Sequence, residues 1–199
     1  MLCPPRLTVY CRTEAPITTA KTLLTAEDHE NLPDDGKRYE LLDGELREAP
    51  VPNPEHAWIT TRIIVPLDIY VRPRGLGHVL AAPSILLRRR PDRVRTPDIG
   101  FFAAGRFPGD RPPARGYPAL VPDLLVEIVS ANDRAAYVEQ KIEEWLAVGA
   151  RLVWAVYPVS RSVVDYRGRT EVRVYQEGER LDGGPVFPDF SLPVGEIFA

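Results

Sequence analysis

The middle of the chain contains two apolar runs separated by an amphipathic segment. The runs DLLVEIVS (residues 123–130) and RLVWAVYP (residues 151–158) are almost continuously apolar, which is typical of strands covered on both faces of a sheet. Residues 134–149, between them, carry apolar side chains at the spacing of one helix face: Val138, Ile142, Trp145 and Leu146. This order predicts a βαβ unit whose two strands run parallel, with a right-handed crossover.

The N-terminal half of the chain carries shorter signals. Thr25 followed by AEDHENL predicts a short helix with a capping residue and acids in its first turn. The segment RYELLDGELREAP predicts a hairpin that turns at Asp43-Gly44, because such turns need the positive φ that glycine tolerates. Residues 54–71 predict a long helix, which Pro66 kinks or ends early.

The remaining segments complete a fold built around a sheet. Strand-like sequences occupy residues 78–89, 96–104, 162–168 and 171–177. Residues 104–122, rich in Gly, Pro and Arg, predict a long loop, and the C-terminal tail predicts short strands or turns. Together the elements predict an α/β (α+β mixed) fold in which helices flank a central mixed β-sheet.

The length and composition are those of one globular domain. With 199 residues, 44% of them hydrophobic, the chain is long enough to bury a core. We expect residues 25–199 to form one domain, and residues 1–24, which have three prolines and no periodic pattern, to form a loosely ordered extension. Its cysteines, Cys3 and Cys11, are too few for a structural zinc site and fit a reduced compartment.

Charge and hydropathy argue against two classes of protein. The net charge of -3 argues against a protein that coats nucleic acid without specificity, although a local basic patch is compatible with it. No stretch approaches the roughly 18 to 20 apolar residues of a membrane span, and the first residues lack the layout of a signal peptide. We therefore expect a cytoplasmic protein that has no membrane segment.

Three charged residues stand where the pattern calls for apolar ones. Glu127 is alone in an apolar run, Lys141 falls in or beside the apolar stripe of the next helix, and Asp98 lies in the strand-like TPDIGFF. Burying a carboxylate or a lysine without a partner costs free energy, and burying the two as a pair lowers that cost. Two carboxylates and a lysine are also the parts of a phosphodiesterase that uses a divalent metal. A purely structural ion pair accounts for Glu127 and Lys141 about equally well.

Several segments of the chain together resemble a known family. The segments RYELLDGEL, PNPEHAWI, RTPDIGFF, PDLLVEIVSANDRAAYVEQKIEEWLAVGARLVWAVYP and SVVDYR, spanning about residues 23–170, resemble the Uma family of restriction endonucleases. That family is a branch of the PD-(D/E)XK nuclease superfamily. The resemblance implies a restriction-endonuclease-like core and cleavage of DNA that depends on Mg²⁺, with Mn²⁺ as an alternative metal.

The resemblance also assigns roles to residues. Pro97-Asp98 matches the PD element, and Glu127 matches the (D/E). Val129 stands where the superfamily usually has lysine, and Lys141 on the next helix matches the lysine of this family.

Two further site residues are expected near this set. Glu40 is expected as a further metal-binding carboxylate, and its alternative is a solvated residue near a hairpin. His56 matches a recurrent family position and could hold a water or touch a phosphate, and its alternative is local bonding at a helix start.

Arginines cluster just before Pro97-Asp98 and could contact DNA phosphates: Arg88, Arg89, Arg90, Arg93 and Arg95. A solvated hairpin connection explains them slightly better. Arg106, Arg111 and Arg115 lie in the following loop, which could close over a bound strand. No zinc finger or helix-turn-helix is evident, so the sequence does not indicate a target sequence.

The leading hypothesis is therefore a metal-dependent DNA endonuclease. Asp98, Glu127 and Glu40 bind the metal, Lys141 positions or activates the attacking water, and His56 supports them. The alternatives are a module of the same fold that binds nucleic acid or protein without cleavage, and a hydrolase of another phosphate ester. A homodimer is expected of a nuclease, because two sites are the simplest way to cut two strands. The three tryptophans, Trp58, Trp145 and Trp154, are expected in the core.

Overall fold

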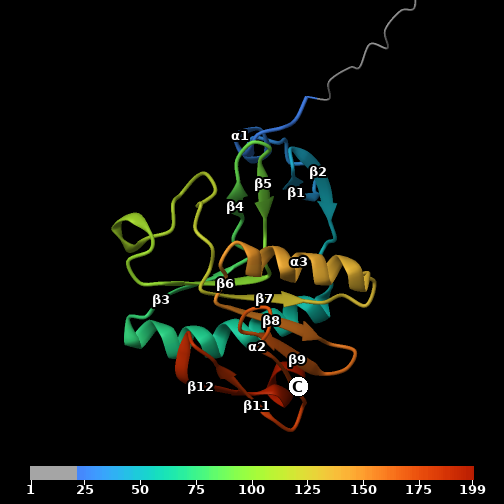
Figure 1. The fold of residues 1–199 in the computed structure, drawn as a ribbon. Coiled ribbons are helices and arrows are strands. Elements are labelled where there is room, and N and C mark those ends of the chain that lie inside the picture. Colours follow the sequence, from blue (N-terminus) through green and yellow to red (C-terminus); the bar gives the residue numbers. More distant parts are fainter. Residues whose placement is uncertain (1–21) are drawn as a thin grey trace, which may run out of the picture.

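A six-stranded mixed sheet lies at the centre of the computed structural model, which describes residues 22–199 (Figure 1). Its strands are β3 (Gly77–Ala81), β6 (Ile99–Ala103), β7 (Leu124–Ile128), β8 (Leu152–Tyr157), β9 (Ser162–Tyr166) and β10 (Val172–Tyr175). They pair in the order β10-β9-β8-β7-β6-β3. In the described residues β7 and β8 are parallel and the other neighbours are antiparallel. The predicted mixed sheet is therefore confirmed.

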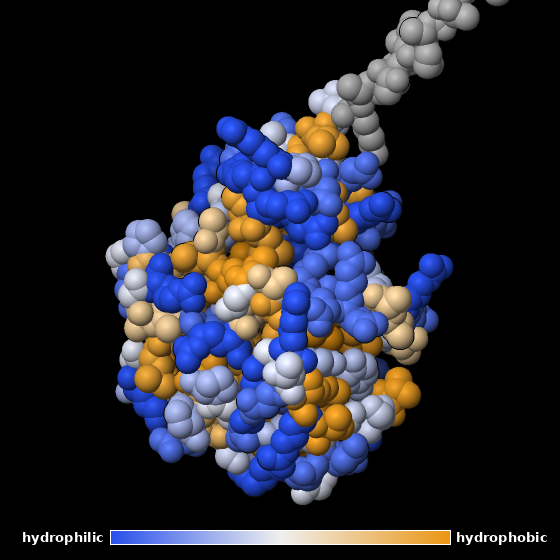
Figure 2. All heavy atoms as spheres, viewed as in Figure 1, coloured by the Kyte–Doolittle hydropathy of each residue, from blue (hydrophilic) through white to orange (hydrophobic). Residues whose placement is uncertain are grey.

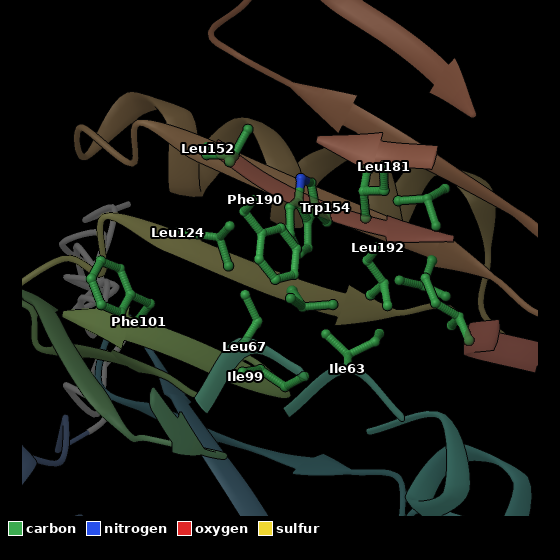
Figure 3. Packing of buried hydrophobic residues seen from close by; sticks show 14 of the residues in the cluster. Ile63, Leu67, Ile99, Phe101, Leu124, Leu152, Trp154, Leu181, Phe190 and Leu192 are labelled. Atoms are coloured by element: carbon green, nitrogen blue, oxygen red, sulfur yellow. The ribbon is translucent and has the colours of Figure 1, made fainter. Parts of the chain in front are cut away.

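Two helices cover opposite faces of this sheet (Figure 1). They are α2 (Pro54–Val71) and α3 (Ala135–Ala147), and α3 connects β7 to β8 as predicted. Alternate side chains of β7 point to opposite faces. Leu124 and Val126 therefore join the core beneath α2, whereas Leu125 joins the core beneath α3. Figure 3 shows Ile63 and Leu67 of α2 packed beneath the sheet.

The C-terminal segment closes the α2 side of the core. It forms a hairpin of β11 (Arg180–Gly183) and β12 (Phe187–Pro193), followed by the short helix α4 (Val194–Phe198). Phe190 and Leu192 of β12 lie next to Trp154 and Leu181 in this core (Figure 3). The short strands were predicted from the tail, but the final helix was not.

A second, four-stranded antiparallel sheet lies beyond α3. Its strands are β1 (Arg38–Leu42), β2 (Glu45–Ala49), β4 (Ile85–Arg88) and β5 (Arg93–Arg95), in the order β2-β1-β5-β4. The hairpin at Asp43-Gly44 is present, with positive φ at both residues. The helix α1 (Ala26–Glu30) begins at Thr25 with the predicted cap.

Three sequence predictions about individual elements need correction. Residues 78–89 are not one strand but β3 and β4, which belong to different sheets, because Ala82 adopts positive φ and Pro83 lacks an N–H for the ladder. The helix α2 has its predicted range, Pro54–Val71, so only the alternative that Pro66 ends the helix early is wrong. Trp145 and Trp154 are fully buried as predicted, but Trp58 is 54% exposed, because it lies on the side of α2 that faces away from the sheet.

The loop predicted at residues 104–122 contains one short turn of helix, η2 (Pro108–Asp110), and a similar turn, η1 (Arg72–Arg74), follows α2. Most of the predicted N-terminal extension, with Cys3 and Cys11, lies outside the described residues. Within residues 22–199, no helix has both the length and the apolar character that crossing a membrane requires.

A glycine allows β3 to lie against β6. Gly77 has a φ of 143°, and a Cβ at this position would lie 2.0 Å from the carbonyl oxygen of Phe102. Gly75 also has positive φ (60°), but a Cβ there would meet no atom within 4 Å. We predict that Gly77→Ala lowers the free energy of unfolding by about 1–3 kcal/mol more than Gly75→Ala, as measured by urea denaturation. Equal losses in the two variants would contradict this close approach.

Candidate active site

A buried ion pair joins the central strand to the helix above it. The alternation along β7 places Glu127 on the same side as Leu125, toward α3. Lys141 Nζ donates to Glu127 Oε2 at 2.7 Å, and Trp145, one helical turn later, donates its Nε1–H to Glu127 Oε1 at 2.7 Å. The predicted pairing of this carboxylate with this lysine is therefore present. Trp145 was predicted only as a core residue and also fixes the carboxylate.

The surroundings shift the pKa of both partners upward. Burial raises the pKa of Glu127 to about 7, with the charge of Asp98 adding to the effect and Lys141 opposing it. Burial by itself would lower the pKa of Lys141, but the nearby carboxylates Glu127 and Glu40 outweigh it and raise that pKa. Lys141 therefore stays protonated at neutral pH and cannot serve as a base.

Asp98 is held beside the end of β7 by backbone contacts. Its backbone N–H donates to the Val126 carbonyl at 3.1 Å, and its Oδ2 accepts from the Ile128 N–H at 2.7 Å. Its other oxygen, Oδ1, lies 3.0 Å from His56 Nε2. Burial by itself would raise the pKa of Asp98, but His56, Lys141 and the Ile128 amide together lower it. Asp98 is therefore ionised at neutral pH.

His56 reaches Asp98 from the first turn of α2. The Asn53 side chain caps this helix by accepting from the His56 N–H at 2.8 Å, and Pro54 occupies the first turn. The cap fixes where α2 begins and so where the imidazole points. His56 therefore contacts a predicted metal-binding carboxylate, and its local bonding at the helix start is also present.

Glu40 lies on β1, where its side chain is buried and paired with an arginine. Arg95 donates to Glu40 Oε2 at 2.6 Å, and Glu40 Oε1 lies 3.9 Å from Lys141 Nζ. Arg95 also pairs with Glu144 of α3 at 2.8 Å, and it is only 1% exposed. Glu40 is therefore not the solvated residue of the alternative interpretation. The prediction that Arg95 contacts DNA phosphates does not fit its burial.

One cleft of about 800 Å³ brings these residues together. It is lined by all five residues predicted for the site: Glu40, His56, Asp98, Glu127 and Lys141. They come from β1, α2, the start of β6, β7 and α3, so the cleft lies where the two sheets and both long helices meet. The segments 49–53 and 129–133 form much of its rim.

The donor set fits a hard cation that keeps most of its own waters. Each oxygen of Asp98 and Glu127 accepts one hydrogen bond or lies beside one donor, and a carboxylate offers about four acceptor positions. Both side chains therefore retain capacity for a metal. Mg²⁺ is commonly bound by one or two carboxylates together with water and substrate phosphate. Within residues 22–199, no group of three or more His, Cys, Asp and Glu side chains is arranged to hold a metal, so Glu40 does not complete a three-ligand cluster.

The other arginines of the basic stretch are mostly engaged with carboxylates. Arg88 and Arg93 pair with Asp43, and Arg89 pairs with Glu27. Among these four arginines, Arg93 is the one whose guanidinium is largely covered, and Arg90 is exposed. These residues form the β4–β5 hairpin, as the alternative interpretation held. Hydrophilic side chains are frequent over this part of the molecule, at the top of the view in Figure 2.

Two residues around the site, Tyr137 and Glu144, were not proposed from the sequence. Tyr137 hydroxyl lies 3.1 Å from Arg95 and 3.3 Å from Glu40. Tyr137, Lys141 and Glu144 lie on one side of α3 at spacings of four and three, which is a signal that could have grouped them. No sequence signal distinguishes the buried Arg95 from the exposed Arg88 and Arg89.

The ion pair makes a thermodynamic prediction. Removing one partner of a buried pair leaves an uncompensated charge, so Lys141→Met should lower the free energy of unfolding by about 3 kcal/mol. Adding Glu127→Gln to this variant removes the stranded charge and should recover much of the loss. Urea denaturation of the wild type, both single variants and the double variant measures the coupling. Additive losses would show that the two side chains are not coupled.

Comparisons with known proteins agree with the fold and identify a family. None of the curated proteins matches this chain. Among solved structures, one from Anabaena variabilis ATCC 29413, described as "a putative nuclease belonging to DUF820", aligns with a TM-score of 0.72 and 23% identity. The alignment covers 88% of this chain and 97% of the other, and at this identity it shows the shared fold. The family model Uma2, described as "Putative restriction endonuclease", matches residues 26–195. The chain therefore belongs to the Uma2 family, and this membership supports a nuclease.

Proposed function

We propose that this protein is a metal-dependent endonuclease that hydrolyses DNA phosphodiester bonds. One observation supports this most strongly: Asp98, Glu127 and Lys141 converge in one open cleft although they come from three separate elements. A structural ion pair would need only Glu127 and Lys141. It would not require Asp98 and His56 beside them at the surface of a cleft. Perturbed, clustered titratable groups in a cleft are typical of an active site.

In this proposal the side chains have distinct roles. Asp98 and Glu127 hold Mg²⁺, or Mn²⁺ in its place. When bound, the metal polarises a phosphate oxygen and acidifies the attacking water. Lys141, protonated throughout, stabilises the negative charge that develops on the phosphate and orients the water by hydrogen bonding. His56 fixes the orientation of the Asp98 carboxylate, and Glu40 keeps Lys141 charged and in place.

The reaction adds water across one phosphodiester bond. The water oxygen forms a bond to phosphorus, and the bond from phosphorus to the O3′ atom breaks. The attacking water has two protons. One reaches the leaving oxygen through solvent and makes it a 3′-hydroxyl, and the other stays on the phosphate or passes to solvent. The phosphate remains on the 5′ side of the next nucleotide. No residue other than the metal-binding pair and Lys141 is needed to balance this step.

An alternative function has one observation in its favour. Among the residues that line the cleft, the cations are Arg38 and Lys141, whereas five are carboxylates: Glu40, Glu55, Asp98, Glu127 and Asp133. A nucleic-acid groove usually carries more positive charge than this. This balance favours a smaller phosphate ester, or binding without cleavage, unless bound metal supplies the missing charge.

The proposed function predicts how the variants cleave DNA. With Mg²⁺ or Mn²⁺ present, the wild type should nick or linearise plasmid DNA, and Asp98→Asn and Glu127→Gln should each abolish detectable cleavage. Lys141→Ala should slow cleavage by about 10²–10³-fold, because one charge-stabilising donor is removed. Asp123→Asn is the matched control, since Asp123 is a buried carboxylate that pairs with Arg106 outside the cleft.

The outcomes of that assay separate the candidate functions. Cleavage that survives in both carboxylate variants would place the active centre elsewhere. Metal binding at these residues without cleavage of plasmid, single-stranded DNA or RNA, but with hydrolysis of bis-p-nitrophenyl phosphate, would point to a smaller phosphate ester. Circular dichroism of each variant checks that it is folded.

The proposed function also predicts how the affinity for Mg²⁺ depends on pH. A metal binds the ionised carboxylate, and the pKa of Glu127 is raised to about 7. The apparent affinity for Mg²⁺ should therefore fall as the pH is lowered through 7, by up to about tenfold per pH unit, while Asp98 stays ionised. Isothermal titration calorimetry between pH 6 and 8 measures this. In Glu127→Gln the pH dependence of the remaining weak binding should be smaller than in the wild type, and an unchanged pH dependence in that variant would contradict the assignment.

A further inference from the structure

Besides Lys141, a second donor holds the Glu127 carboxylate. The Trp145 Nε1–H donates to Glu127 Oε1 at 2.7 Å, while Lys141 Nζ donates to the other oxygen, Oε2, also at 2.7 Å. Lys141 and Trp145 are four residues apart on α3, so they lie on the same side of the helix. One donor on each oxygen fixes the plane of the carboxylate, whereas a single donor would leave it free to turn about its terminal bond.

The indole that supplies this second donor is itself held in place. Trp145 is fully buried, and it packs with Phe102, Leu125 and Ile142 in the apolar core beneath α3. Because the indole N–H is shielded from water, Glu127 is the partner that satisfies it. The core packing therefore sets the position of the donor, and the donor holds the carboxylate in one orientation before any ligand binds.

The indole orients the carboxylate without adding charge to the site. Glu127 and Asp98 carry two negative charges when both are ionised, and Lys141 carries one positive charge. These three groups together keep a net negative charge, which attracts a divalent cation. A second cationic donor in the place of Trp145 would cancel that charge, so a neutral N–H suits a metal-binding carboxylate better than a second lysine or arginine would.

We propose that Trp145 is a positioning residue that sets the affinity of the cleft for its divalent metal. The inference rests on the proposed function, in which Glu127 binds Mg²⁺, and it assigns a role to a residue that the reaction itself does not require. In the described part of the chain, the residues that line the cleft do not include Trp145, so it acts through Glu127 and does not touch metal or substrate. Hydrogen-bond partners of metal-binding side chains typically contribute about 10–100-fold to metal affinity or activity.

Substitution of the two buried tryptophans tests this role. Trp145→Phe removes the donor and keeps an aromatic ring in the core. Trp154→Phe is the matched control, because Trp154, labelled in Figure 3, is also fully buried and its Nε1 has no hydrogen-bond partner among the described residues. Isothermal titration calorimetry should show an affinity for Mg²⁺ about 10–100-fold lower in Trp145→Phe than in the wild type, with no comparable loss in Trp154→Phe. Circular dichroism checks that both variants are folded.

Nuclear magnetic resonance of the wild type tests the contact without any substitution, so the inference stays testable even if Trp145→Phe does not fold. The chain has three tryptophans, so three indole N–H signals can be assigned. Saturating Mg²⁺ should shift the indole signal of Trp145, because a metal draws electron density from the carboxylate that accepts this hydrogen bond. The indole signal of Trp154, whose N–H does not contact the site, should stay in place.

Comparison with the carboxylate variants separates this inference from the proposed function. If Asp98→Asn and Glu127→Gln weaken Mg²⁺ binding but Trp145→Phe weakens it no more than Trp154→Phe does, the proposed function stands and the positioning role is overturned. A Trp145 indole signal that does not move in saturating Mg²⁺ would overturn that role as well. No binding of Mg²⁺ to the wild type, or an affinity that neither carboxylate substitution changes, would overturn the proposed function and this inference with it.

Discussion

The buried charge on Glu127 is the constraint on which the rest of the structure depends. A carboxylate in the middle of an apolar strand must find a partner, and Lys141 supplies it from the helix that follows. Forming this pair, together with the bond from Trp145, fixes the rotation of α3 on the sheet. The same rotation points Tyr137 and Glu144 toward the second sheet, so a single ion pair determines what α3 presents on its other side.

A chain of charged groups then ties the second sheet to the first. Glu144 of α3 pairs with Arg93 and Arg95 of β5, and Arg95 pairs with Glu40 of β1. Glu40 in turn approaches Lys141, which closes the chain of contacts at the candidate cleft. Arginines used in this way are not free to bind phosphate. A bound metal is the natural source of the positive charge that the cleft lacks, which is why the proposed chemistry depends on one.

The sequence predicted the parts of the fold in which local pattern and burial agree. The βαβ unit follows from two apolar runs and a helical stripe, and Glu127 and Lys141 stand out because they break those patterns, as functional residues often do. It did not predict the separation of β3 from β4, since the turn at Ala82 and Pro83 depends on which sheet each half joins. Arg95 and Trp58 were misjudged for the same reason: burial is set by packing between elements, which residue type alone does not reveal.

The most direct test of the metal centre is a crystal structure of the protein with Mn²⁺ and a short DNA duplex, measured at a wavelength that reveals the metal by anomalous scattering. The account predicts an anomalous peak within coordination distance of carboxylate oxygens of both Asp98 and Glu127, with a phosphate beside it and Lys141 Nζ facing that phosphate. Mn²⁺ bound away from these two carboxylates, with Glu127 and Lys141 still paired and no phosphate near them, would contradict it and leave the pair as a structural element of the core.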